Sequence, residues 1–360
     1  MSGAELSLYD FIERSCQKYE FFIVLPKEYN GCLIGTRSIS YFLYFEWFYI
    51  TLNPIRLFQF SYSTVKSTFQ LIKIINRHRI DLIYANTEKA NLYAVIVQFF
   101  TKKKIVWVIR DNIKNNSINK ILIKRSDILI TVSKHILGQL PSERPNKYVV
   151  YGGADIKKWI PETIPKKTLK NELSLQNDTL LVAQVGQLTR WKNQFDFIKV
   201  AELIRKSRFN VHFLIIGDDL SGREKKYKTE LFDLVNELRL KKYISFLGNR
   251  QDIIKVLNQI DILIHTAINE PFGRVIIEAM SMEKPVLAYN FGGPKEIIMN
   301  NETGYLINPY DIEEMSEKAI LLLKNKKLRK QFGKAGRKRV SEKFNIDKYV
   351  KEMEYVLDSA

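Results

Sequence analysis

The chain has 360 residues, of which 46% are hydrophobic, and a formal net charge of +18. Because a single hydrophobic core seldom grows this large, we expect two domains of roughly 150 to 200 residues each. The positive charge favours an anionic partner, such as nucleic acid, an anionic membrane surface or a phosphorylated substrate, without deciding among them.

Cysteine usage and hydropathy exclude several classes of protein. The two cysteines, Cys16 and Cys32, are too few for a disulfide framework and have no metal-ligand spacing, which favours a reducing cytoplasm. The N-terminus lacks the pattern of a signal peptide, and no run of about 20 uncharged apolar residues occurs. We therefore predict a protein that is neither secreted nor membrane-spanning.

In the first half, short apolar runs alternate with longer segments of helical period, the pattern of βαβ units and parallel sheets. Residues 2–5 lead directly into a helical stretch at 6–16, without the apolar strand and glycine loop that should begin such a domain. We therefore expect a central first strand upstream, in a sequence that is truncated or starts too late. Strands are predicted at 21–25, 82–85, 105–109, 128–132 and 149–151.

Aromatic and basic residues gather between Tyr41 and Phe60 and just beyond. On one amphipathic surface they can lie in the headgroup layer of an anionic membrane. The near-continuous apolarity fits a buried core helix equally well, and both interpretations stay open. The residues are Phe42, Phe45, Trp47, Phe48, Tyr49, Leu57 and Phe58, with Arg56, Lys66, Lys73, Arg77 and Arg79.

A polar stretch at 160–167, punctuated by proline, can continue neither a helix nor a central strand. We place the domain boundary there, with domains at 1–160 and 161–343, and expect a helix at 344–360 to pack back on the first. Both are predicted to be doubly wound α/β domains, whose sheets face each other across a ligand crevice. The second has predicted strands at 180–185, 211–216, 244–247, 262–265 and 285–288, then helices from 312 onward.

Two carboxylates seven residues apart, Glu270 and Glu278, follow the predicted strand at 262–265. A helix starting near Arg274 places Glu278 about one turn in, roughly 6 Å along its axis, and leaves Glu270 in the loop. The amides and partial positive charge at 273–275 can hold phosphates, while the glutamates accept hydrogen bonds from hydroxyls. An arbitrary pair with this spacing is usually two surface glutamates. The residues around Glu270 and Glu278 favour a binding site instead.

This segment resembles the E-x7-E region of family 4 glycosyltransferases, and the resemblance extends over nearly the whole chain. Residues 283–288, 291–298 and 303–307 resemble the family's strand, glycine loop and closing turn. Residues 185–193 resemble its G-R-L-x-x-x-K-G loop, in which Lys192 matches the lysine that faces the donor diphosphate. Gln187 and Asn193 depart from the motif, so Arg190 would supply the missing charge. A solvated loop lysine is the alternative for Lys192.

Three segments of the first half carry the resemblance further. Residues 2–5 resemble the G-G-A-E loop, with Gly3 matching one glycine and Ser2 replacing the other. Residues 151–155 resemble the N-G-V-D segment, although a glycine turn at a strand end explains them equally well. Arg110 stands where many relatives have a histidine near the reacting sugar, and a cation there could contact phosphate.

We interpret the four histidines of the chain as structural, because their spacing fits neither a metal site nor a nucleophilic site. They are His78, His135, His212 and His265.

The resemblance implies a GT-B fold and a retaining, metal-independent enzyme of the hexosyltransferase type. It would move a sugar from a nucleotide diphosphate sugar to a hydroxyl of a glycan or lipid-linked acceptor, in bacterial surface polysaccharide synthesis, and would need no cofactor. The implied catalytic residues are Glu270, Lys192 and Arg190. The implied donor-binding residues are Gly3, Gly186, Phe272, Gly273, Arg274, Val275 and Glu278, and further candidates are Arg110, Gly292 and Gly293, the two glycines permitting close backbone approach to a ligand.

Three other functions stay open. A GT-B sugar-nucleotide epimerase would use the donor without an acceptor. A nucleic-acid-binding protein would account for the charge, but no helix-turn-helix, zinc or RNA-recognition pattern occurs, and we expect no nucleic-acid partner. An inactive scaffold would fit the absent first strand and the changes at Gln187 and Arg110. We expect the protein in the cytoplasm, with the inner face of the cell membrane as a candidate location.

Overall fold

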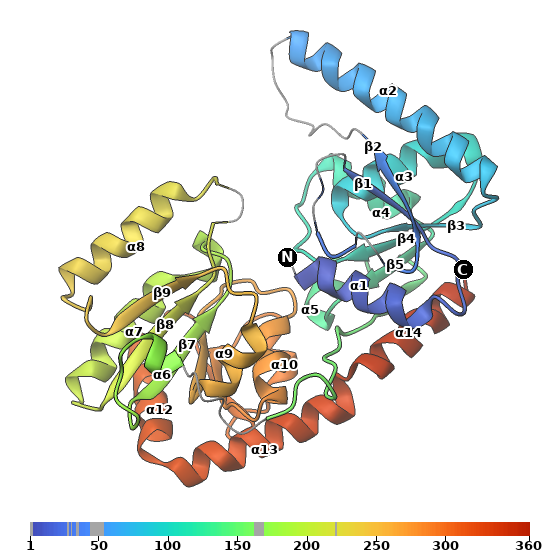
Figure 1. The fold of residues 1–360 in the computed structure, drawn as a ribbon. Coiled ribbons are helices and arrows are strands. Elements are labelled where there is room, and N and C mark those ends of the chain that lie inside the picture. The colour runs from blue at the N-terminus through green and yellow to red at the C-terminus, as the bar shows by residue number, and fades with distance from the viewer. Residues whose placement is uncertain are drawn as a thin grey trace. The chain divides into compact units, whose positions relative to one another are not determined.

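A computed structural model describes residues 3–26, 29, 31–33, 36–43, 54–161, 169–219 and 222–360, with the backbone alone at 42, 43 and 54–61. The chain folds into two compact units, Met1–Tyr151 with Asp347–Ala360, and Gly152–Ile346 (Figure 1). The crossing from the first unit to the second therefore precedes the polar stretch at 160–167. Most of that stretch, 162–168, lies outside the described residues.

The described residues of the first unit form two parallel sheets. Strand β1 (Phe22–Pro26) pairs with β2 (Ile39–Leu43), which was not predicted because it runs into the aromatic stretch. The second sheet has the order β3 (Leu82–Ala85), β4 (Lys104–Ile109), β5 (Ile128–Thr131) and β6 (Lys147–Val149). Strand β5 is buried along its whole length and β4 beyond its first residue, which explains their near-continuous apolar sequences.

Several helices of the first unit begin at side-chain caps. Thr87 accepts the amide of Ala90, Asn116 that of Asn119 and Ser133 that of Ile136. Helix α14 lies beside α1, as Figure 1 shows, and Ser15 Oγ donates to the Glu354 carboxylate across 2.8 Å. The helices are α1 (Gly3–Ser15), α2 (Pro54–Arg77), α3 (Glu88–Thr101), α4 (Ser117–Arg125), α5 (Lys134–Leu137) and α14 (Ile346–Asp358).

Much of the aromatic stretch lies outside the described residues, at 44–53, and its side chains at 42, 43 and 54–61 are likewise outside them. Its two interpretations therefore stay predictions, as does any role of Ser2. Within the described ranges, no helix has both the length and the apolar character needed to cross a bilayer.

The second unit contains one six-stranded sheet in which all neighbouring strands are parallel. The strands are β7 (Leu180–Val185), β8 (Val211–Ile216), β9 (Ile244–Gly248), β10 (Ile262–His265), β11 (Val286–Tyr289) and β12 (Gly304–Ile307). Their order is β12-β11-β10-β7-β8-β9, so the chain winds outward from β7 in one direction and from β10 in the other. The resemblance predicted a closing turn at residues 303–307, but residues Gly304–Ile307 form strand β12.

Helices cover this sheet, and their apolar faces form its core. Phe197 on α7, Leu231 on α8 and Met315 on α12 are fully buried against strand residues such as Phe213 and Ile264. The helical elements are α6 (Leu169–Glu172), the 3₁₀ turn η1 (Arg190–Lys192), α7 (Gln194–Lys206), α8 (Lys225–Glu237), α9 (Ile253–Gln259), α10 (Arg274–Ser281), α11 (Pro294–Ile297), α12 (Ile312–Lys324) and α13 (Lys326–Lys343).

Candidate active site

Two loops of the second unit meet at the carboxyl ends of its two central strands. Strands β7 and β10 are neighbours, with Val182 opposite Ile262 and Ala183 opposite Leu263. Winding reverses between these two strands, and doubly wound sheets bind their ligands outside the carboxyl ends at such a point. The loop at 186–193 follows β7, and the loop at 266–273 follows β10. Both predicted motif loops therefore lie at this switch point.

Lys192 and Glu270 form an ion pair across these loops. Lys192 Nζ lies 2.5 Å from Oε2 of Glu270, and the two side chains are only 14% and 9% exposed. The lysine stem passes over Gly186, where an added Cβ would lie 3.3 Å from Lys192 Cδ. Its ammonium lies 4.1 Å from the ring centroid of Trp191, a cation–π contact. Both charged residues were predicted to act on the donor, but their mutual contact was not predicted.

His265, the last residue of β10, also contacts Glu270. Its Nε2 lies 3.1 Å from the same Oε2 atom, and its side chain is 1% exposed. Burial lowers the pKa of His265, so its imidazole is neutral near pH 7, and Nε2 then carries the proton that the carboxylate accepts. From the sequence, His265 was predicted to be structural, and this contact was not predicted. Its place at a strand end, five residues before Glu270, was the available signal.

Glu270 is an anion with one oxygen left for a ligand. Burial alone would raise its pKa, but the Lys192 charge and the hydrogen bond from His265 more than offset burial and lower the pKa to about 2. Both contacts fall on Oε2. No residue in the described ranges donates a hydrogen bond to Oε1. Oε1 can therefore accept a hydrogen bond from a bound hydroxyl.

A buried hydrogen-bond network ties the two loops together. Gln184 Nε2 donates to the carbonyl of Lys192 and to Oγ1 of Thr266, both across 2.9 Å. Thr266 Oγ1 donates in turn to the carbonyl of Asn193 across 2.7 Å. These buried hydrogen bonds favour one geometry of the two loops, although Oε1 of Gln184 has no hydrogen-bond partner in the described residues. The backbone that carries Lys192 is therefore fixed to the loop that carries Glu270.

Helix α10 begins at Arg274, the start assumed from the sequence in placing Glu278 one turn in, and Val275 is its second residue. Its N-cap residue Gly273 has a φ of 105°, a region that favours glycine. Glu278 is 8% exposed, and its Oε1 accepts a hydrogen bond of 2.9 Å from Arg274 Nε one turn earlier. This carboxylate, predicted to accept hydrogen bonds from hydroxyls, is thus held by a cation of its own helix.

The glycine loop packs on the Glu270 loop. Gly293 N donates to the Glu270 carbonyl across 2.9 Å. An added Cβ on Gly292 would lie 2.4 Å from that carbonyl oxygen, and one on Gly293 would lie 2.2 Å from the Phe272 carbonyl oxygen. From the sequence, these glycines were predicted to permit close backbone approach to a ligand. In the structure they approach the protein's own backbone and hold the loop that carries Glu270.

The ring of Phe272, another predicted donor-binding residue, packs inside the second unit. It is 8% exposed, and its centroid lies 6.1 Å from that of Phe344. An added Cβ on Gly152 would lie 2.9 Å from its Cε1 atom. Any contact of Phe272 with a ligand would therefore be made by its backbone.

Arg190 lies in the same loop as Lys192 but has a different partner. Its guanidinium donates to both carboxylate oxygens of Glu230 on α8, across 2.7 and 3.0 Å. It also lies 5.3 Å from the ring centroid of Tyr227. The catalytic charge predicted for Arg190 is therefore engaged in an exposed ion pair.

Two predicted residues belong to the first unit. Gly3 is the first residue of α1, and its carbonyl accepts a hydrogen bond from Ser7 Oγ. Arg110 follows β4 and donates from Nε to Asn86 Oδ1 across 2.7 Å and from its terminal nitrogen to Tyr349 OH across 3.4 Å. In the described residues, no group of three His, Cys, Asp or Glu side chains could hold a metal ion.

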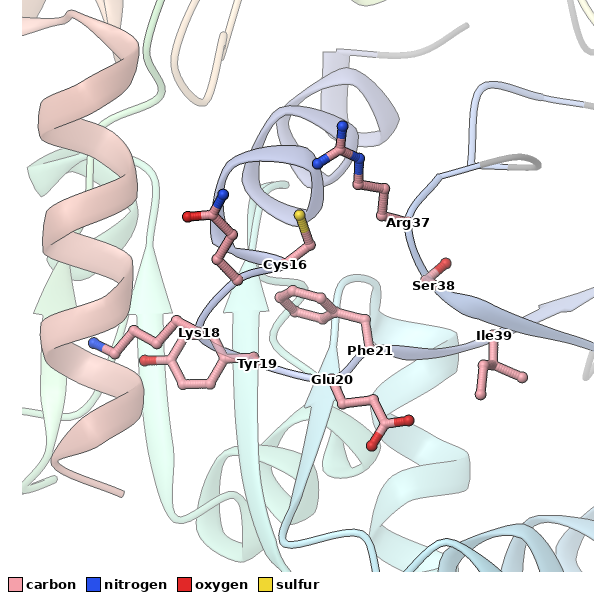
Figure 2. A pocket seen from close by; sticks show the side chains of 9 residues that line it. Cys16, Lys18, Tyr19, Glu20, Phe21, Arg37, Ser38 and Ile39 are labelled. Carbon is pink, nitrogen blue, oxygen red and sulfur yellow. The ribbon is translucent and has the colours of Figure 1, made fainter.

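An open hollow of about 520 Å³ lies on the first unit and contains none of the predicted site residues. Figure 2 shows Lys18 and Tyr19 at its rim directed toward α14, where each contacts the Asp358 carboxylate across 2.5 Å. These polar groups are thus engaged by the protein itself, and we assign the hollow no ligand. It is lined by Cys16, Gln17, Lys18, Tyr19, Glu20, Phe21, Arg37, Ser38 and Ile39.

Residues 165–339, nearly all of the second unit, match the model of the family described as "Glycosyl transferases group 1". The second unit is a group 1 glycosyl transferase domain. The predicted family and enzyme class are therefore confirmed, and the loops of Lys192 and Glu270 both lie within the matched residues.

Relatives of this glycosyltransferase cover most of the chain. The capsular polysaccharide biosynthesis glycosyltransferase CapM of Staphylococcus aureus is 26% identical over 313 residues, which are 81% of this chain and 80% of CapM. The N-acetyl-alpha-D-glucosaminyl L-malate synthase of Bacillus anthracis is 23% identical over 328 residues, 85% of this chain and 82% of the synthase.

A solved structure shows the fold of this glycosyltransferase. The crystal structure of Anabaena Alr3699/HepE in complex with UDP-glucose matches with a TM-score of 0.85 and 24% identity, over 100% of this chain and 97% of that one. The fold is the GT-B fold, built from two Rossmann-like domains, as the sequence resemblance predicted.

Proposed function

We propose that this glycosyltransferase moves a sugar from a nucleotide diphosphate sugar to a hydroxyl of a glycan or lipid-linked acceptor, with retention of anomeric configuration and without a metal ion. The observation that carries the proposal is the contact of Lys192 and His265 with one oxygen of Glu270 at the β7/β10 switch point. A cation suited to a phosphate leaving group lies there beside a carboxylate suited to a sugar hydroxyl. The UDP-glucose in the Anabaena complex supports a donor of this class.

In this proposal Lys192 stabilises the leaving diphosphate. The hydrogen-bond network fixes its backbone and Glu270 holds its ammonium, so the charge is in place before the reaction begins. Preorganised cations and amides act most strongly on charge that develops in the transition state. The N-terminus of α10, at Gly273, Arg274 and Val275, would contribute amides and a partial positive charge.

Glu270 is proposed to hold the transferred sugar through Oε1. Because its pKa is about 2, the carboxylate only accepts hydrogen bonds and cannot serve as a general acid near neutral pH. Lys192 and His265 prevent it from rotating away, since both hold Oε2. Glu278, fixed by Arg274, would accept from the ribose in the same way.

The proposed reaction needs no carboxylate nucleophile. The bond between the anomeric carbon and the diphosphate oxygen breaks, and the acceptor oxygen bonds to the same face of that carbon. The departing phosphate oxygen takes the proton of the acceptor hydroxyl. Arg190 and the backbones of Gly3, Gly186 and Phe272 stay predictions in this scheme, because Arg190 has Glu230 as its partner and Gly3 lies in the first unit.

We further propose that the enzyme acts in bacterial surface polysaccharide synthesis, in the cytoplasm. The support is the name of CapM, a relative of which this chain covers 80%.

Mixing the purified protein with a panel of nucleotide sugars, and measuring the melting temperature, tests donor binding. Stabilisation by a uridine or other nucleoside diphosphate sugar, beyond that given by the free nucleoside, is the expected result. Product analysis with and without acceptor glycans then separates transfer from epimerisation. A new epimeric sugar nucleotide formed without acceptor would overturn the transfer assignment.

A further inference from the structure

Helix α13 (Lys326–Lys343) carries a large part of the chain's excess charge. Its 18 residues include nine basic side chains and one acidic side chain, Glu342, a net charge of +8 in a chain whose net charge is +18. The helix runs along an edge of the second unit (Figure 1). The charge excess is therefore concentrated on one element rather than spread over the surface.

The arginines and lysines of α13 have different surroundings. Arg329 donates to the carbonyls of Leu322 and Leu323, both across 2.7 Å. Arg337 donates to the carbonyl of Trp159, and Arg339 donates to that of Ile297. All three arginines thus cap backbone groups of the second unit, which leaves the lysines to form the outer face.

Five lysines form a continuous exposed face, which we call the lysine face: Lys326, Lys327, Lys330, Lys334 and Lys338. At 100° per residue they fall within an arc of about 120°, over an axial length of about 18 Å. All five are exposed, and none forms an ion pair or side-chain hydrogen bond with a residue in the described ranges. Intramolecular pairing therefore does not explain them.

The opposite face of α13 is packed too tightly for the helix to move freely. Phe332 and Val340 are buried. An added Cβ on Gly333 would lie 2.0 Å from the Glu283 carbonyl oxygen, and one on Gly336 would lie 3.3 Å from Met280 Cγ. The helix backbone that carries the lysine face is therefore held in place by the second unit.

Two of these lysines oppose the helix dipole. Lys326 and Lys327 are the first two residues of α13, and its first turn contains no acidic residue. Cations destabilise a helix N-terminus. Helix stability therefore does not account for their placement, whereas attraction to an external anionic surface does.

We propose that the lysine face binds the surface of an anionic lipid bilayer. Basic clusters on a helix face are attracted to anionic lipid, with about a fivefold gain in affinity for each lysine near the surface. Nucleic acid is less well matched, because arginine forms the bidentate phosphate contacts and every arginine of α13 is occupied by carbonyl groups. This inference does not depend on the proposed donor chemistry, and it concerns a surface distinct from the aromatic stretch near residues 41–60.

Vesicle sedimentation of the whole protein tests the proposal. The probes are vesicles of phosphatidylcholine alone and of phosphatidylcholine mixed with phosphatidylglycerol, at low and high salt. Two variants with equal changes of charge are compared, and both alter exposed lysines of the second unit. The lysine-face variant combines Lys327→Gln, Lys330→Gln, Lys334→Gln and Lys338→Gln, and the control combines Lys225→Gln, Lys226→Gln, Lys241→Gln and Lys242→Gln.

The wild-type protein is expected to sediment with the anionic vesicles only, and to be released at high salt. The lysine-face variant should lose at least about a hundredfold in affinity, while the control stays within a few fold of wild type. Equal loss in both variants, no binding by wild type, or tighter binding to a DNA duplex than to the vesicles would overturn the proposal. A rise in melting temperature on adding a nucleotide sugar that is the same in wild type and both variants shows that donor binding is a separate property.

Discussion

His265, at the end of β10, donates its Nε2 hydrogen to Oε2 of Glu270 across 3.1 Å. The imidazole is buried and neutral, so it orients the carboxylate without adding a charge. Lys192 adds the charge at the same oxygen. The two contacts divide the support of Glu270 into an electrostatic part and a directional part, and substitutions can test each separately.

Lys192→Met should remove the cation that stabilises the leaving group and lower kcat by a factor of about 10² to 10³. It also leaves a buried Glu270 without its ion-pair partner, at a cost to folding of about 3 to 5 kcal/mol. Steady-state transfer rates and urea unfolding measure the two effects. Lys199→Met is the matched control, because Lys199 is an exposed residue of α7. Equal kcat in wild type and Lys192→Met would refute the role of the lysine.

His265→Leu should lower kcat by about tenfold, because it removes the hydrogen bond that orients Glu270 while keeping an apolar side chain in the buried site. His265→Gln, whose amide can donate from a similar position, should restore much of the rate. The control is His212→Gln on β8, since His212 Nε2 contacts Ser245 Oγ and has no contact with Glu270. If the Leu and Gln variants of His265 have the same kcat, His265 is only a packing residue.

Stability should fall as pH is lowered through the ordinary histidine pKa of 6.5. Burial lowers the folded pKa of His265, so below pH 6.5 the unfolded chain binds a proton that the folded chain does not, and folding weakens. His265 faces Glu270 and Lys192, and Glu270, with its pKa of about 2, stays ionised over this range.

His265→Gln removes this proton linkage and should flatten the decline in unfolding free energy between about pH 7 and pH 5. Denaturant titrations at several pH values measure it. His212, whose pKa burial also lowers, should account for a second part of the decline. An unchanged pH dependence in His265→Gln would show that the folded imidazole titrates normally.

Gly292→Ala should displace the loop of Glu270 and reduce both stability and kcat. The added Cβ would lie 2.4 Å from the Glu270 carbonyl oxygen, which must then move. Gly222→Ala is a close control, because Gly222 has a φ of +67° against +63° for Gly292 and nothing within 4 Å of its added Cβ. Thermal melts and transfer assays compare the pair. Similar losses in both would mean that backbone strain alone, and not the contact with Glu270, is responsible.

Local patterns in the sequence determined much of the second unit. The apolar runs predicted β7, β8 and β10 with the bounds that the structure has, and the strand–loop–helix order expected around the two glutamates is that of β10, its loop and α10. The motif residues also indicated the glycosyltransferase family. These features depend on residues close together in the chain, where hydrophobic period and turn residues decide the local structure.

The first unit shows where such patterns stop being sufficient. Strand β2 runs into an aromatic stretch whose composition fits either a membrane-facing or a buried surface, and its parallel pairing with β1 joins residues far apart in sequence, such as Phe22 and Ile39. Strand partners depend on the order of strands in a sheet, and that order is a property of the whole domain.

The chemistry of the site was decided by tertiary structure. Lys192 and Glu270 are 78 positions apart and meet because β7 and β10 are adjacent in the sheet. The turn after β10 brings a histidine without a motif onto Glu270, and the adjacency of β10 and β11 lays Gly292 and Gly293 against its loop. By itself the sequence determined which residue types were present and which local elements carry them. Only the packing of parallel strands decided which atoms touch, because hydrogen bonds and ion pairs act over a few ångströms.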